Sequence, residues 1–66
     1  MNLIVNGEAR QVAPGITVAG LLAELGLAGK PVAVEVNMEL VPAVRHAERR
    51  LAEGDRLEIV TLVGGG

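Results

Sequence analysis

The 66-residue chain contains no cysteine, and this absence excludes several classes of small protein. A domain of this length buries only about 60% of the surface of its unfolded chain, so many such domains depend on disulfides or metals. Without cysteine, a disulfide framework, a cysteine-based zinc site and thiol chemistry are all unavailable. The single imidazole, that of His46, would leave a metal site to carboxylates, and we expect no bound metal. Stability must therefore come from aliphatic packing.

The sequence also lacks aromatic residues, and its formal net charge is −2 at pH 7. Proteins that bind nucleic acids usually present a basic face and aromatic stacking platforms, and neither is evident here. No stretch approaches the roughly 20 apolar residues of a membrane-spanning helix. The first residues lack the basic region and long apolar run of a signal peptide. We therefore predict a soluble cytoplasmic domain that binds neither nucleic acid nor membrane.

Side chains suited to nucleophilic or acid–base catalysis are scarce. The chain has no serine or tyrosine, its hydroxyls are those of Thr17 and Thr61, and its one lysine is Lys30. A hydrolytic triad needs a nucleophile, a base and an orienting group within reach of one another. Thr17 is better placed as a helix cap, and we expect His46, in an arginine-rich stretch, to be an exposed polar residue. The eight carboxylates are spread along the chain and indicate a solvated surface, so we predict no catalytic side chain.

Half of the residues are hydrophobic, and their spacing first predicts a β-hairpin. Residues 2–5 and 8–12 are strand-like, and the Asn6-Gly7 pair between them is the strongest short hairpin signal, which favours a type I′ turn. The sequence "APG" at 13–15 ends the second strand.

Residues 16–26, "ITVAGLLAELG", have the pattern of a helix. Thr17 is the expected N-cap, because its hydroxyl can accept an otherwise unpaired backbone N–H. Gly26 can end the helix in a left-handed conformation. We interpret Gly20, inside the helix, as a site of close approach between helix and sheet. Four aliphatic residues recur at helical spacing and form one apolar stripe: Val18, Leu21, Leu22 and Leu25.

The second half of the chain predicts two further strands. Alternating valines mark a third strand at 30–37, and a turn and a brief edge segment follow at 37–42. Residues 43–52 fit either a short helix or a turn. A tight turn at 53–55 leads into the last strand at 56–62. In that strand Leu57, Ile59 and Thr61 point to one face, and Arg56, Glu58, Val60 and Leu62 point to the other.

The order strand, strand, helix, strand, small insert, strand predicts an α+β fold. The compact arrangement is a β-grasp (ubiquitin-like) roll: a mixed sheet of four to five strands, with the first and last strands central and parallel, and one main helix on one face. A ferredoxin-like split is an alternative, but it needs two full helices. We expect the β-grasp domain to span residues 1–62 and a flexible glycine tail to span 63–66.

The chain ends "TLVGGG", and the three glycines suggest a use for the C-terminus. Residues without a Cβ can stay extended and thread a channel too narrow for a side chain. The outer face of the last strand becomes apolar near the tail, which suits a docking partner. The basic stretch 45–50 usually indicates a solvated face, although it could dock onto an acidic partner. The predicted partner-binding residues are Val60, Leu62, Val63, Gly64, Gly65 and Gly66.

Four segments of the chain resemble the ThiS family of sulfur carrier proteins in thiamin biosynthesis: "NLIVNGE", "TVAGLLAELGL", "VAVEVNMELVP" and "LAEGDRLEIVTLVGGG". The resemblance covers the whole chain. It implies that a ThiF-type enzyme uses ATP to adenylate the Gly66 carboxylate. A sulfur donor, usually a persulfide on a cysteine desulfurase, then gives a thiocarboxylate. Thiazole synthase (ThiG) accepts the tail and its sulfur. The carrier itself would be no enzyme and would bind no cofactor.

Two alternatives share this carboxylate chemistry. One is the small subunit of molybdopterin synthase, although those chains tend to be longer and to carry aromatic residues. The other is a carrier for tRNA thiolation, which could also be conjugated to proteins. An alternative of another class is a non-catalytic β-grasp module that binds a protein through Val60, Leu62 and the stretch 45–50.

Overall fold

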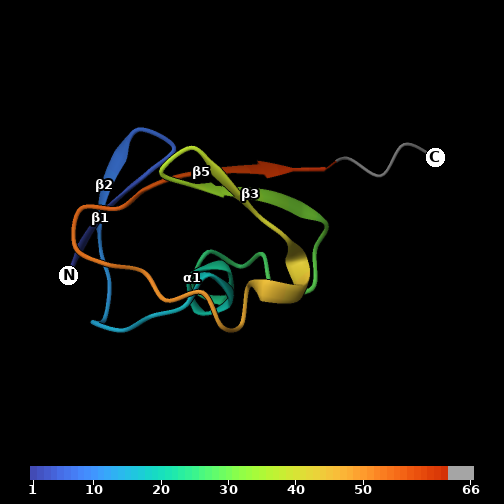
Figure 1. Ribbon diagram of the computed structural model, residues 1–66, viewed down its shortest axis with the longest axis horizontal. Helices are drawn as coiled ribbons and strands as arrows, with labels where there is room; N and C mark the ends of the chain where they lie inside the picture. Colours follow the sequence, from blue (N-terminus) through green and yellow to red (C-terminus); the bar gives the residue numbers. More distant parts are fainter. Residues whose placement is uncertain (63–66) are drawn as a thin grey trace.

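A computed structural model of the chain describes residues 1–62, which form a five-stranded sheet and one α-helix (Figure 1). In chain order the elements are β1 (Asn2–Val5), β2 (Glu8–Gln11), α1 (Val18–Glu24), β3 (Val32–Val36), β4 (Glu39–Val41), the 3₁₀ turn η1 (Ala43–Arg45) and β5 (Arg56–Thr61). The predicted glycine tail at 63–66 lies outside the described residues, and so do the predicted partner-binding residues Val63, Gly64, Gly65 and Gly66.

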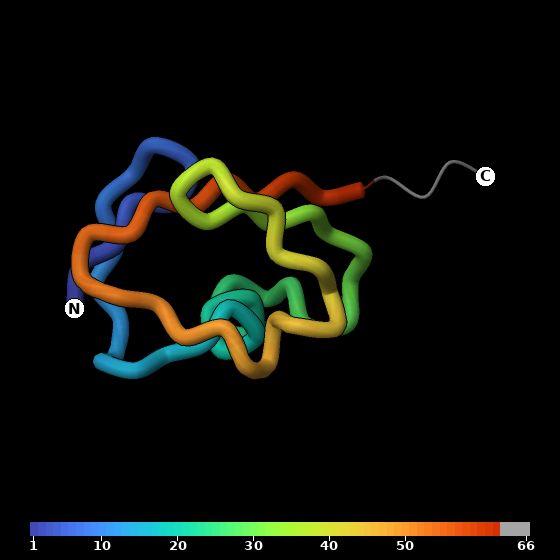
Figure 2. Tube along the Cα trace, in the orientation of Figure 1, coloured from blue at the N-terminus to red at the C-terminus, as the bar shows by residue number. Residues whose placement is uncertain are grey.

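The sheet has the strand order β2-β1-β5-β3-β4. β1 and β5 pair in parallel at interior positions, and the other neighbouring strands pair antiparallel. The single helix lies against one face, and the chain from η1 to β5 returns past that helix (Figure 2). The predicted β-grasp roll is therefore confirmed. η1 is one short turn and supplies no second full helix of the kind that a ferredoxin-like fold needs.

The element ends differ from the expected ones by one or two residues, for identifiable backbone reasons. The third strand begins only after Pro31, which has no N–H for the ladder, and it ends before Asn37, whose φ is 50°. The helix begins at Val18 because Thr17 is extended, with φ −92° and ψ 169°. Gly26 has φ 75°, which confirms the left-handed conformation expected after the helix. The predicted type I′ turn agrees with positive φ at both of its central residues.

The core lies between the inner face of the sheet and α1. Leu57 and Ile59 of β5 point into it, as their alternation along the strand predicts. Every residue of the edge strand β2 is exposed, so this strand contributes hydrogen bonds and little apolar burial. The buried aliphatic residues are Leu3, Val5, Val12, Val18, Leu21, Leu22, Val34, Val36, Val41, Leu51, Leu57 and Ile59.

The segment 43–52, whose sequence fits either a short helix or a turn, supplies acceptors for backbone N–H groups in the first turn of α1. The N–H of Val18 donates to the Arg49 carbonyl and the N–H of Ala19 to the His46 carbonyl, each at 2.9 Å. The next two N–H groups bond to Thr17, one to its Oγ1 at 3.1 Å and one to its carbonyl at 2.9 Å. All four N–H groups at this helix end are thus paired. The predicted capping role of Thr17 is confirmed.

The prediction that His46 is exposed is wrong. Its side chain is only 8% exposed, and its Nε2 donates to the Val41 carbonyl at 2.9 Å. The residue is drawn inward because its own carbonyl must reach the N-terminus of α1. The neighbouring arginines in the sequence are more exposed to solvent than His46, and they led to the wrong prediction that His46 is exposed as well.

Replacing His46 by alanine should lower the free energy of unfolding by about 1–3 kcal/mol, because the Val41 carbonyl would lose its donor in a buried site. Urea denaturation would measure the loss. Val44→Ala is the matched control, since Val44 is largely exposed and nearby; it should stay within about 0.5 kcal/mol of wild type. Equal midpoints for the two variants would contradict a structural role for the imidazole.

The interpretation of Gly20 also needs correction. A Cβ at this position would lie 2.9 Å from Cγ1 of Ile16 and 3.4 Å from Oγ1 of Thr17. Its close neighbours therefore belong to the chain that enters the helix, and the sheet is not among them. Ile16 is half-buried against the core, so this close packing fixes the direction in which the chain enters α1.

Candidate functional site

β5 is the last strand of the described chain, and Gly66 follows its end by five residues. β5 lies in the middle of the sheet, yet it runs on beyond the β1–β2 hairpin (Figure 1). A central strand normally has a neighbour on each side along its whole length. β3 accompanies β5 to Thr61, whereas β1 ends at Val5 and leaves the other side of β5 without a strand.

Asn6 ends the pairing on the β1 side. Its Nδ2 donates to the Ile59 carbonyl at 3.1 Å, and its Oδ1 accepts from the Ile59 N–H at 2.7 Å. The side-chain amide thus takes the place of one residue of a strand. At the same point the backbone of Asn6 has φ 50° and turns into β2. β1 therefore stops beside Ile59, while β5 continues to Thr61.

Pro31 ends the pairing on the β3 side. The Leu62 N–H donates to the Pro31 carbonyl at 2.9 Å. Proline has no N–H, so Pro31 cannot return a bond to the Leu62 carbonyl, and the ladder ends there. Sequence reasoning did not predict these roles. The Asn-Gly pair indicated only a turn, and the position of Pro31 opposite Leu62 depends on the register of strands distant in the sequence.

Asn6→Ala should destabilise the domain by about 2–5 kcal/mol, since it removes two hydrogen bonds and holds alanine at positive φ. Chemical denaturation monitored by circular dichroism would measure the change. Asn2→Ala is the matched control, because Asn2 is exposed and its side chain makes none of the side-chain hydrogen bonds found among residues 1–62. If both variants unfolded at the same denaturant concentration, the assigned role of Asn6 would be wrong.

Two of the predicted docking residues, Val60 and Leu62, lie at the C-terminal end of β5 and just beyond it. Val60 is 57% exposed and Leu62 is 51% exposed. Their exposure agrees with the alternation expected along the strand. Glu58 precedes Val60 on the outer face of β5 and lies directly opposite Glu35 of β3. Like charges in such a pair repel, so the outer face combines an acidic centre with an apolar end next to Leu62.

The basic stretch 45–50 lies on the helix side of the sheet. Arg50 forms a β-bridge with Thr17 at the start of α1, and η1 lies in the helix layer (Figure 1). Val60 is on the opposite face of the sheet. The structure therefore separates Val60 from the basic stretch, whereas Leu62 lines one pocket together with His46 of that stretch.

Two of the few side chains that could take part in catalysis are engaged in the fold. Thr17 Oγ1 caps α1, and the His46 ring bonds to the Val41 carbonyl. Within residues 1–62, no three His, Asp or Glu side chains lie close enough together to hold a metal ion. No helix in the described part of the chain is long and apolar enough to cross a membrane. The feature that stands out is thus the end of β5.

Comparison with known proteins connects this arrangement to one family. The model of the ThiS family matches residues 3–66. The sulfur carrier protein ThiS of Escherichia coli is 30% identical over the full length of both chains. The sulfur carrier protein ThiS of Thermus thermophilus is 39% identical, and the match covers 94% of this chain and 95% of the relative.

A thiazole synthase from Paramagnetospirillum magneticum is 47% identical over 66 residues. The match covers all of this chain, which spans about a fifth of the length of the thiazole synthases it matches. The crystal structure of a thiamine biosynthesis protein (ThiS) from Geobacter metallireducens has a TM-score of 0.84 and 35% identity over the whole of both chains. The chain therefore belongs to the ThiS family.

Proposed function

We propose that this member of the ThiS family is a sulfur carrier of thiamine biosynthesis, which holds sulfur as a thiocarboxylate on Gly66. The observation that carries the proposal is the end of β5, where Asn6 and Pro31 end its pairing with the two neighbouring strands. The four residues 63–66 can extend the chain by at most about 14 Å beyond Leu62. A partner that reaches the Gly66 carboxylate must therefore come close to this end of the sheet.

The proposed chemistry acts on the carboxylate alone. A carboxylate is a poor electrophile, so a ThiF-type enzyme first joins it to AMP from ATP and releases pyrophosphate. The outer sulfur of a persulfide, as on a cysteine desulfurase, then attacks the acyl carbon, and AMP leaves. Reduction of the resulting S–S bond by a thiol leaves the thiocarboxylate on Gly66. The carrier binds no cofactor, and we assign the exchange to the cytoplasm, where thiols are kept reduced.

Thiazole synthase is the proposed sulfur acceptor. Relatives named thiazole synthase contain a segment similar to this whole chain within a longer polypeptide, which supports a joint action of the two. We propose that the partners dock on Val60 and Leu62, and that residues 63–66 enter their active sites. The exposure of these two apolar side chains supports this assignment.

Pyrophosphate exchange into ATP by the adenylating enzyme of the same genome would test the proposal. The wild-type chain should support the exchange, and a chain ending at Gly64 should support none while melting at the same temperature. The buried aliphatic residues of the described part of the chain lie at 3–59, so we expect the truncated chain to keep its fold. Exchange supported equally by the truncated chain would show that Gly66 is not the reactive terminus, and would favour a binding module.

A further inference from the structure

The backbone of β5 has an open edge next to the proposed site. Hydrogen bonds alternate in direction along a strand. The N–H of Leu62 bonds toward β3, at the Pro31 carbonyl, whereas the Leu57 carbonyl accepts from Asn6 on the β1 side. Residues with even numbers in β5 therefore face β3, and those with odd numbers face β1. The N–H and C=O of Thr61 consequently point to the β1 side.

No strand among the described residues is present there to receive them. β1 ends at Val5, and the side chain of Asn6 pairs with Ile59 but reaches no farther along β5. Thr61 is exposed. It takes part in none of the hydrogen bonds found among residues 1–62 outside the strand ladders. Among residues 1–62, neither backbone group of Thr61 has a partner, and the position beside it could take a further strand.

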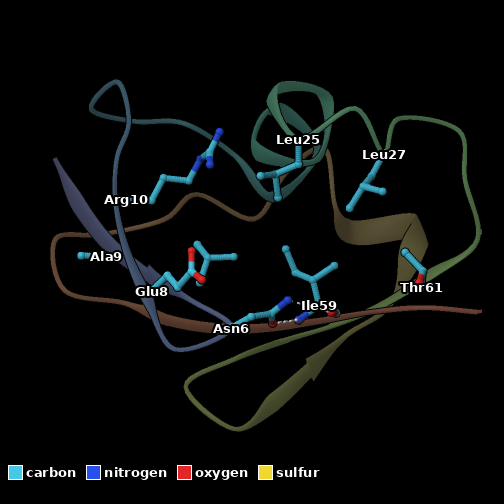
Figure 3. Close-up of a pocket in the computed structure, with 9 residues that line it drawn as sticks. Asn6, Glu8, Ala9, Arg10, Leu25, Leu27, Ile59 and Thr61 are labelled. Carbon is cyan, nitrogen blue, oxygen red and sulfur yellow. Dashed lines mark hydrogen bonds between the residues drawn. The ribbon is translucent and has the colours of Figure 1, made fainter.

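A cleft of about 440 Å³ adjoins this edge (Figure 3). Ile59 lies in the middle of it, and Leu25 and Leu27, which follow α1, point down from the opposite side (Figure 3). Glu8 and Arg10 of β2 form the far wall, with one charge of each sign. The cleft therefore offers apolar contacts in its centre and no net charge at its rim.

We infer that thiazole synthase adds an extended segment to this edge, pairing its backbone with Thr61 and placing an aliphatic side chain in the cleft. In strand addition, main-chain hydrogen bonds give affinity and side-chain pockets give specificity. The added strand would lie beside β5 in the position that β1 vacates at Asn6. It would then run next to the chain that leads to Gly66.

The choice of occupant follows from the relatives named thiazole synthase, in which a segment similar to this whole chain is part of a longer polypeptide. At most about 14 Å of chain separates Leu62 from Gly66, so a partner that acts on Gly66 comes close to this edge. The inference rests on the proposed function, since it specifies how the sulfur acceptor holds its carrier. It concerns binding only, and it requires no sulfur on Gly66.

Thr61→Pro and Thr61→Val form the test pair. Proline removes an N–H that points away from β3, so no ladder bond of the domain is lost, whereas valine keeps that N–H. Binding of each variant to thiazole synthase from the same genome would be measured by calorimetry. We expect Thr61→Pro to bind about tenfold more weakly, or worse, than Thr61→Val. Wild-type affinity of Thr61→Pro would overturn the inference.

Amide exchange of the unsubstituted chain gives a second readout that needs no variant. The Thr61 amide should exchange rapidly in the free protein and about tenfold more slowly in the saturated complex. The Leu62 amide, bonded to Pro31, is the internal control and should be protected in both states. Unchanged exchange at Thr61 in the complex would overturn the inference. Concentration-dependent protection without thiazole synthase would also overturn it, because the occupant would then be a second copy.

These outcomes separate the inference from the proposed function. If Gly66 acquires sulfur while Thr61 stays unprotected in the complex, the carrier function stands and strand addition fails. If Thr61 becomes protected but Gly66 is never adenylated, strand addition stands and the carrier function fails.

Discussion

Valine in place of Gly65 should reduce adenylation of the chain by about 100-fold or more and leave its melting temperature unchanged. A β-branched side chain next to the reacting carboxylate cannot pass a channel built for residues without a Cβ. The folded body should not respond, because its buried core lies within residues 3–59. Mass spectrometry of the acyl-adenylate or its thiocarboxylate product, together with a thermal melt, would measure both effects.

Gly65→Ala is the graded control for this experiment. Its single methyl group should cause a smaller loss than valine if channel width is the cause. Adenylation of Gly65→Val at the wild-type rate would refute the narrow-channel explanation, and unfolding of that variant would refute the separation between body and tail.

Leu57→Ala should lower the free energy of unfolding by about 2–5 kcal/mol. Leu57 is 1% exposed in the central strand β5 and lies opposite Val36, which is also fully buried. Small domains have little stability to lose, so a large fraction of this variant should be unfolded at about 37 °C. Urea denaturation with far-ultraviolet circular dichroism would measure the change.

Val60→Ala is the control on the same strand. Val60 lies on the outer face and is 57% exposed, so its truncation should cost no more than about 0.5 kcal/mol. Similar losses for the two variants would contradict the assignment of inner and outer faces along β5.

Local patterns in the sequence predicted much of this fold. The Asn6-Gly7 turn, the Thr17 cap and the alternation along β5 depend on neighbours within a few residues, and all three agree with the structure. These features also limit the topology to a helix on one face of a mixed sheet.

Most of the errors arose where distant segments meet, whereas the error at Gly20 was local. His46 is buried because its carbonyl bonds to the start of α1, far away in the sequence. Gly20 is close to Ile16, although the pattern alone suggested the sheet. The contacts that end the pairing of β5 depend on the register between strands that are distant in the sequence. Asn6 lies beside Ile59, and Pro31 lies opposite Leu62. The proposed site was predicted from the glycine tail, the apolar end of the last strand and the family resemblance, whereas the contacts that end the pairing of β5 required the structure.

Intact-mass measurement of the chain tests the central claim most directly. The protein would be incubated with the adenylating enzyme of its genome, ATP and a sulfide source. A carrier should gain the mass difference between one sulfur and one oxygen, and fragmentation should locate that gain on the C-terminal peptide at Gly66. An unchanged mass, with an enzyme shown to be active on another carrier, would contradict the sulfur-carrier function.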